Sequence, residues 1–275
     1  MCRLTAPLSF EFELDDMATQ QVFETVYRGR QSALRHMAYM RMSKVLLIQQ
    51  ILHKAGIDLA GKSIFDYGFG AGTFFRYCPL NTRLFGVEMD PVTVEEVGRM
   101  LARRGHPEVT LAPIDPEHWT THPLLQQSYD VVLCSHVLEH LPDPIDVLRR
   151  LKACLKPDGA LVVLLPLNER QSNPHHVHTV DHGKIVDWLQ ASALRMICYQ
   201  EADPWTYWIQ PFFADDSGSG GGFVRILAQA FSLGLGIPST LVGYRMWEQL
   251  SKPFGWLTRS KPTQAAFVCN RIATH

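Results

Sequence analysis

Histidine and acidic side chains gather at two places in this sequence. The first is the run His136-Val137-Leu138-Glu139-His140, and the second is a group of four histidines between residues 175 and 182. Histidine suits a general base because the pKa of its side chain lies at about 6.5, close to neutral pH. Histidine beside a carboxylate can also hold a divalent metal ion. The residue types therefore favour chemistry that moves a proton, with a metal as an alternative.

A glycine-rich loop, Asp66-Tyr67-Gly68-Phe69-Gly70-Ala71-Gly72, follows a short apolar run. The pattern predicts a strand that ends in an acid. A tight turn is predicted to follow it. Glycine is expected because the turn needs backbone conformations closed to other residues, and because a Cβ would collide with a ligand lying on the loop. The spacing G-x-G-x-G differs from the G-x-G-x-x-G of a dinucleotide site, whose acid lies about 20 residues later. Taken alone, the pattern also fits a glycine-rich turn in another kind of α/β domain.

The next predicted strand also ends in an acid. Leu84-Phe85-Gly86-Val87 closes on Glu88, with a helix predicted between the glycine loop and this strand. This order is a βαβ unit, in which an acid at the second strand end can accept both hydroxyl groups of a ribose. Asp90, which precedes Pro91, is expected to cap the following helix.

Helices and strands alternate along the remaining chain. Apolar periodicity predicts helices at 17–36 and 38–55 before a first strand at 63–66, and a short helix that reaches Cys78 before Pro79. A turn is predicted at Lys156-Pro157-Asp158-Gly159. Further strands are predicted at 84–88, 109–111, 129–136, 160–166, 195–201 and 265–272, and further helices from Pro91, at 145–155 and at 181–191.

Three stretches resemble class I S-adenosylmethionine-dependent methyltransferases. The segment from Asp66 to Gly72 resembles the first motif of that family, and Glu88-Met89-Asp90-Pro91 resembles the second. The segment 129–166 resembles the fourth-strand and fifth-strand motifs closely. The resemblance implies an α/β, Rossmann-like, doubly wound seven-stranded sheet, with N-terminal helices and a helical insertion before the last strand. The last strand is expected to run antiparallel at the sheet edge.

The resemblance implies S-adenosylmethionine as methyl donor and S-adenosylhomocysteine as product. In the family the glycine loop wraps the methionine part, the acid at Glu88 binds the ribose, and Met89 flanks the adenine. An acid at Asp115 often holds the adenine amino group, although a loop Asp beside Pro116 is equally well a solvated turn residue. The implied cofactor-binding residues are Asp66, Gly68, Gly70, Gly72, Glu88, Met89, Asp115, Ser135 and His136.

The acceptor side of the site is expected just past the fourth and fifth strands. His136, His140 and His178 are the predicted catalytic residues, and His136 acts either as a general base or by shaping the cofactor pocket. Other polar residues follow the same strand ends, namely Asn168, Glu169, Asp181 and His182. The residues predicted to contact the substrate are His175, His176, Trp205 and Trp208.

The run from His136 to His140 also matches the H-x-x-E-H pattern of inverted zinc peptidases. We reject that interpretation because the pattern follows a buried strand inside a methyltransferase frame. The Glu139–His140 pair resembles that of ubiquinone-pathway O-methyltransferases and small-RNA 3′-end methyltransferases, where related positions can bind a divalent ion. The prediction is a site without metal, and the alternative is a metal held by Glu139, His140 and His178.

Three parts of the chain are distinguished. Residues 1–58 are predicted to form an N-terminal helical cap, and residues 59–202 with 263–275 the S-adenosylmethionine-binding domain. The insertion 203–262 begins with aromatic residues and a glycine–serine run. It is interpreted either as a substrate lid or as an added helical layer.

The composition of the chain indicates which kinds of binding partner to expect. Charged residues make up 19%, below the usual value of about 25%, and the net charge is −1 with no basic block. A nucleic-acid partner is therefore not expected. The six cysteines lack C-x-x-C spacing, which fits a protein of the reduced cytoplasm. No transmembrane segment is predicted. A homodimer formed through the N-terminal helices is an open alternative.

These observations predict a methyltransferase that acts on a small, fairly apolar acceptor, with O-methylation of a hydroxyl or carboxyl group preferred. Methylation at carbon or nitrogen is the first alternative. A methyltransferase acting on RNA and a non-catalytic module that binds the cofactor are further alternatives.

Overall fold

The computed structural model describes residues 39–115, 119–167, 176–202 and 261–272, together with scattered residues between 230 and 259. Several predictions lie outside the described residues. These are the helix at 17–36 and the site residues Asn168, Glu169, His175, Trp205 and Trp208.

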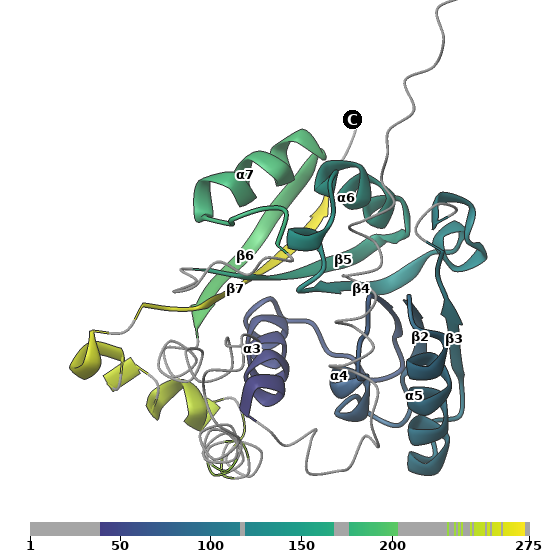
Figure 1. The fold of residues 1–275 in the computed structure, drawn as a ribbon, viewed down its shortest axis with the longest axis horizontal. Helices are drawn as coiled ribbons and strands as arrows, with labels where there is room; N and C mark the ends of the chain where they lie inside the picture. The colour runs from purple at the N-terminus through teal and green to yellow at the C-terminus, as the bar shows by residue number, and fades with distance from the viewer. Residues whose placement is uncertain are drawn as a thin grey trace, which may run out of the picture.

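A seven-stranded sheet in the order β3-β2-β1-β4-β5-β7-β6 forms the centre of the fold (Figure 1). Neighbouring strands from β3 to β5 run parallel, while β7 is antiparallel to both of its neighbours. The doubly wound α/β prediction is confirmed. The strands are β1 (Ser63–Tyr67), β2 (Arg83–Glu88), β3 (Val109–Pro113), β4 (Tyr129–Ser135), β5 (Leu155–Pro166), β6 (Leu194–Ala202) and β7 (Gln264–Arg271).

The expectation that the last strand lies at the sheet edge was wrong. Strand β7 pairs with β5 on one side and with β6 on the other, so β6 is the edge strand. The reason is visible in the burial. Residues 264–269 of β7 are all buried, whereas most of β6 is exposed or half-buried, and a strand that is buried and mostly apolar on both faces is more stable between two neighbours.

Helices cover both faces of the sheet, as Figure 1 shows. Buried side chains of α3 (Tyr39–Lys54), α4 (Thr73–Arg76) and α5 (Pro91–Arg104) pack on one face. Those of α6 (Pro144–Ala153) and α7 (His182–Ala191) pack on the other. Three short 3-10 turns lie between the other elements: η1 (Trp119–Thr121), η2 (Pro123–Gln126) and η3 (Leu138–His140).

Local sequence explains where several helices begin. Asp90 accepts hydrogen bonds from the backbone N–H groups of Val92 and Thr93, so its predicted capping role is confirmed. Asp181 caps α7 in the same way, through the N–H of Lys184. Helix α4 is a single turn that ends at Arg76, shorter than predicted. None of the helices in the described ranges combines the length and apolar character needed to cross a lipid bilayer.

The predicted turn at 156–159 is an irregularity within β5. Pairing with β4 steps from Tyr129↔Leu155 directly to Val131↔Ala160, so the residues between them bulge out of the ladder. A Cβ at Gly159 would lie 2.8 Å from the carbonyl oxygen of Tyr129, which explains the glycine.

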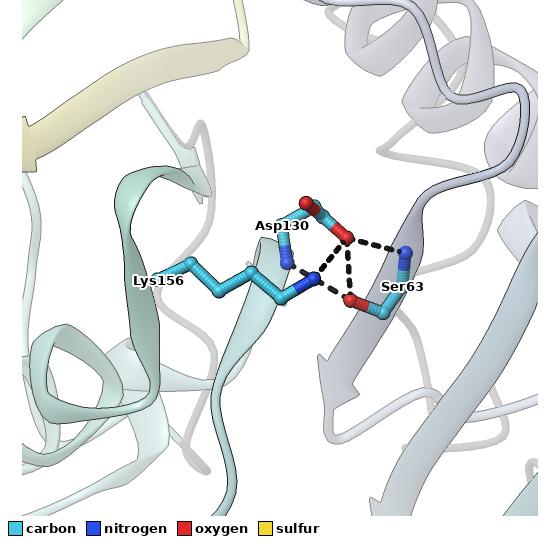
Figure 2. A network of polar contacts seen from close by, with 3 residues as sticks. All are labelled: Ser63, Asp130 and Lys156. Carbon is cyan, nitrogen blue, oxygen red and sulfur yellow. Dashed lines mark hydrogen bonds and ion pairs between the residues drawn. The ribbon is translucent and has the colours of Figure 1, made fainter.

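A polar network joins this bulge to the start of the sheet (Figure 2). The carboxylate of Asp130 accepts hydrogen bonds from the backbone N–H and hydroxyl of Ser63, at 2.8 and 2.6 Å. It also accepts one from Lys156 Nζ at 2.7 Å. Burial opposes ionisation of Asp130, but the bonds from Lys156 and Ser63 outweigh it and hold the pKa of the carboxyl well below its usual range. The network therefore joins β1, β4 and β5 near the amino ends of these strands, and the glycine loop lies at the opposite, carboxyl end.

We expect the substitution Asp130→Asn to lower the free energy of unfolding by about 2 kcal/mol at neutral pH, because charge-assisted hydrogen bonds are lost. A carboxyl with a lowered folded-state pKa stabilises fully above its unfolded pKa of about 3.9 and loses this effect as pH falls further. The difference from wild type should therefore persist above that pH and shrink below it. Urea unfolding across this range measures it.

The control is Asp158→Asn, which changes an exposed carboxyl in the same bulge. Equal destabilisation by the two substitutions, or a difference independent of pH, would contradict this role for Asp130.

Candidate active site

The glycine loop follows β1 and contains three residues with left-handed backbone conformations. The φ angles are 75° at Gly68, 50° at Gly70 and 66° at Gly72. Side chains disfavour this region, so the conformational reason for glycine is correct. The sequence analysis also expected that a Cβ on these glycines would collide with a ligand, and this reason needs correction at two positions. A Cβ at Gly68 would lie 2.5 Å from Val137 Cγ2, and one at Gly72 would lie 2.5 Å from Val97 Cγ1. The close approach there comes from protein side chains.

Glu88 fixes the loop from the neighbouring strand. Its Oε2 accepts the backbone N–H of Gly70 at 2.7 Å, and its Oε1 accepts that of Met89 at 2.8 Å. Burial raises the pKa of the carboxyl, and the two backbone donors partly offset that effect. A carboxylate oxygen can accept more than one hydrogen bond, so Glu88 can bind further donors beside the loop.

Asp66 lies on β1, directly before the loop. Its carboxyl is buried, and within the described part of the chain Oδ1 has no hydrogen-bond partner. Burial and the nearby charge of Glu88 raise the pKa of Asp66 well above its ordinary value. An unpaired buried carboxyl beside a second one suits a ligand that carries positive charge and hydrogen-bond donors. S-adenosylmethionine, with its ammonium and sulfonium groups, fits this requirement.

The other predicted cofactor residues lie at the same edge of the sheet. Met89 follows β2 and is partly exposed, Asp115 is exposed just past β3, and Ser135 ends β4. The N–H of Ile114 donates to Glu88 O, which holds the chain after β3 beside the end of β2. The structure therefore brings together the residues that the sequence analysis assigned to the cofactor.

His136 lies just past β4, where the sequence analysis predicted the acceptor side of the site. It follows β4 with a φ of 55°, a conformation that is unfavourable for a residue with a side chain, and its N–H donates to Leu164 O. Its Nδ1 lies 3.3 Å from Glu139 Oε1, and its Nε2 lies 3.5 Å from Gln264 Oε1. Both ring nitrogens of His136 therefore face protein groups.

Two residues that the sequence analysis missed hold this arrangement. Gln264, the first residue of β7, is buried and donates through Nε2 to Ser43 Oγ on α3 at 3.0 Å. Burial and the charge of Lys44 lower the pKa of His136, with Glu139 and Gln264 only partly offsetting them, so its ring is neutral at neutral pH. Ser43 and Gln264 are 221 residues apart, and no local pattern in the sequence indicates such a contact.

Glu139 forms a cluster with two imidazoles. One ligand atom each from Glu139, His140 and His176 lies within 4.8 Å of the others. Glu139 is fully buried, and apart from the 3.3 Å contact of Oε1 with His136 Nδ1 its carboxylate oxygens have no hydrogen-bond partner among the described residues. Burial opposes its charge, but the adjacent His136 outweighs this and lowers the pKa of the carboxyl. Two imidazoles and a carboxylate are a ligand set that divalent zinc accepts.

His178 and His182, which the sequence analysis placed near this cluster, have other contacts. The His178 ring packs on Trp188 at 5.3 Å between centroids, its backbone N–H donates to Glu139 O, and its Nε2 is buried without a described partner. The His182 ring packs on Tyr199. The structure thus places His176 in the cluster, where the alternative metal set had His178.

Comparisons with known proteins agree on the family. A family model described as "Methyltransferase domain" matches residues 36–208, well over half of the chain. The ubiquinone biosynthesis O-methyltransferase of Actinobacillus pleuropneumoniae serotype 5b is 31% identical over 124 residues, which are 42% of this chain and 50% of that protein. The protein of the same name from Marinobacter nauticus is 32% identical over 114 residues, 39% of this chain and 45% of that protein. The chain spans about half the length of these curated relatives.

Solved structures share the fold. The cyclase SpnF has a TM-score of 0.62 at 14% identity, over 94% of this chain and 96% of that one. Coclaurine N-methyltransferase bound to N-methylheliamine and S-adenosylhomocysteine has a TM-score of 0.55 at 13% identity, over 96% and 90%. At these identities the likeness concerns the fold alone.

We propose that the cluster of Glu139, His140 and His176 can bind a divalent cation. Equilibrium dialysis of the protein against Zn²⁺ or Mn²⁺ should give one bound ion per chain. The isosteric Glu139→Gln should weaken binding at least about tenfold, because a neutral amide replaces the carboxylate ligand. His182→Gln, which changes a histidine outside the cluster, is the control. Absence of binding by the wild type, or equal affinity in Glu139→Gln, would refute the site.

Proposed function

Because the chain belongs to the methyltransferase domain family, and by family and fold is a class I S-adenosylmethionine-dependent methyltransferase, we propose that it methylates an oxygen of a small, fairly apolar acceptor. The observation that carries this proposal is the position of the cluster around His136 and Glu139, past the strand that adjoins the cofactor loop. The curated relatives, named as O-methyltransferases, support oxygen as the methylated atom.

The chain offers a distinct group for each part of the cofactor. Glu88 would accept hydrogen bonds from the ribose hydroxyls, since its oxygens already point at the loop and retain free lone pairs. Asp66 would accept from the positively charged methionine end through its unpaired Oδ1. Met89 and Asp115 would contact the adenine. When bound, S-adenosylmethionine supplies an electrophilic methyl group on its sulfonium.

Removal of the acceptor proton needs a base next to that methyl group. His136 contacts Glu139 and Gln264 through its two ring nitrogens, so we assign it to positioning. We assign proton removal to His140, whose imidazole borders Glu139 and packs against His176. With a divalent ion held by Glu139, His140 and His176, His140 would instead be a ligand, and the ion would lower the pKa of a bound acceptor hydroxyl group.

Other reactions are compatible with the fold. One structural neighbour is named as a cyclase and another as an N-methyltransferase, so architecture alone does not fix the reaction. The low charge of the chain and its net charge of −1 weigh against an RNA acceptor. A carboxylate acceptor would need no base. The effect of replacing His140 on the rate therefore distinguishes a hydroxyl acceptor from a carboxylate acceptor.

The test incubates the protein with methyl-labelled S-adenosylmethionine and three acceptor classes: an alkyl-substituted catechol, its amine analogue and a fatty acid. We expect label on the catechol oxygen, and a fall in kcat of about 100-fold or more in His140→Gln, as for loss of a general base. The control His182→Gln should keep its activity. Label on the amine, or no transfer to any acceptor, would refute the proposal. Label on the fatty acid with His140→Gln fully active would keep oxygen as the methylated atom and refute the role of His140 as the base.

A further inference from the structure

Large apolar side chains are concentrated on the surface of the segment before β7. Residues 245–250, 252–253 and 255–258 are helical. In this short stretch Met246, Leu250, Trp256 and Leu257 are all exposed, and Trp256 and Leu257 keep 83% and 76% of their surface accessible. Met246 and Leu250 lie one helical turn apart and so share one side of the helix. Exposed apolar groups gathered in this way mark an interaction surface.

The same segment is attached to the body of the protein by its other side. Trp247 packs against Tyr39 of α3, with ring centroids 5.1 Å apart. Arg245 donates to His53 Nε2 of the same helix at 3.1 Å. The exposed side chains are therefore held outward by a segment that is anchored to α3. In Figure 1 the segment, in yellow-green, lies beyond the end of the sheet that carries β6 and β7.

Positive charge accompanies these apolar groups. A groove of about 770 Å³ lies between the end of α3, strand β6 and this segment, and is lined by Gln50, His53, Lys54, Gln200, Arg245, Glu248, Gln249 and Lys252. Among its described lining residues the cations are Lys54, Arg245 and Lys252, and the one acid, Glu248, is paired with Lys252 at 2.6 Å. Arg259 and Lys261 are exposed just after Trp256 and Leu257. This local excess contrasts with the net charge of −1 for the chain.

We propose that residues 245–261 dock on the surface of a bilayer that contains anionic phospholipids. Tryptophan and leucine would enter the boundary between headgroups and acyl chains, where an indole ring is favoured. Arg259 and Lys261 would contact lipid phosphates, and each cation near such a surface strengthens binding by about fivefold. The inference rests on exposure and charge and holds whichever acceptor is methylated. It also explains why a segment that packs on α3 leaves its largest apolar groups in water.

The test is co-sedimentation of the full chain with vesicles of phosphatidylcholine, with or without phosphatidylglycerol. Binding should require phosphatidylglycerol and weaken as salt is raised. The double substitution Trp256→Ser with Leu257→Ser should reduce the partition coefficient at least about tenfold, by loss of apolar burial. Arg259→Glu with Lys261→Glu should reduce it by more, since each change reverses a charge.

The control variants change exposed groups of the same kinds elsewhere on the protein. Leu80→Ser with Ile197→Ser removes two apolar side chains that are each 51% exposed, and Arg99→Glu with Arg103→Glu reverses two cations on α5. These variants should bind vesicles like wild type. Failure of the wild type to bind, or equal losses in the controls, would overturn the proposal. So would a dimer in light scattering without lipid that Trp256→Ser and Leu257→Ser abolish, because the surface would then join two copies of the chain.

Discussion

The carboxylate of Glu88 accepts the backbone N–H groups of Gly70 and Met89, and this pair of hydrogen bonds fixes the glycine loop against strand β2. Glycine adopts each of the three left-handed conformations in this loop at little steric cost, and the two hydrogen bonds select this one arrangement of the loop. Its glycines in turn admit Val97 of α5 and Val137 beyond β4, so the loop is packed from both sides. A buried acid thus determines the shape of the cofactor end, and its charge raises the pKa of Asp66 beside it.

The acceptor end depends on a second chain of polar contacts. Ser43, Gln264, His136 and Glu139 connect helix α3, the start of β7 and the end of β4. Val137 lies between His136 and Glu139 in sequence while its side chain packs over Gly68, so the two ends of the site share one short segment. A substitution in that segment would therefore affect the glycine loop and the imidazole cluster together.

Much of this architecture could be predicted from the sequence because it depends on local signals. Apolar runs that end in acids marked β1 and β2, a nearly continuous apolar run marked β4, and Asp90 before Pro91 marked the start of α5. The order of the last two strands could not be predicted in this way. It depends on which of two strands, β6 or β7, buries more apolar surface, and that is a property of the assembled sheet.

The positions of the residues proposed to bind the cofactor were predictable for the same reason, since the carboxyl ends of parallel strands meet at one edge of the sheet. The partners of His136 were not, because Ser43 and Gln264 are brought together only by the fold. The choice of His176 over His178 depends on which ring packs against Trp188, and the spacing of the histidines does not indicate it. Side-chain contacts between distant elements are thus the part of the site that required the structure.

Titration calorimetry with S-adenosylhomocysteine tests the central claim most directly, because it asks whether the loop held by Glu88 binds the cofactor. We predict saturable binding of one molecule per chain. Binding should be weaker by about 10–100-fold in Glu88→Gln, which loses charge-assisted hydrogen bonds, and unchanged in Glu95→Gln, an exposed acid on α5. No binding by the wild type, or equal affinity in Glu88→Gln, would contradict the account.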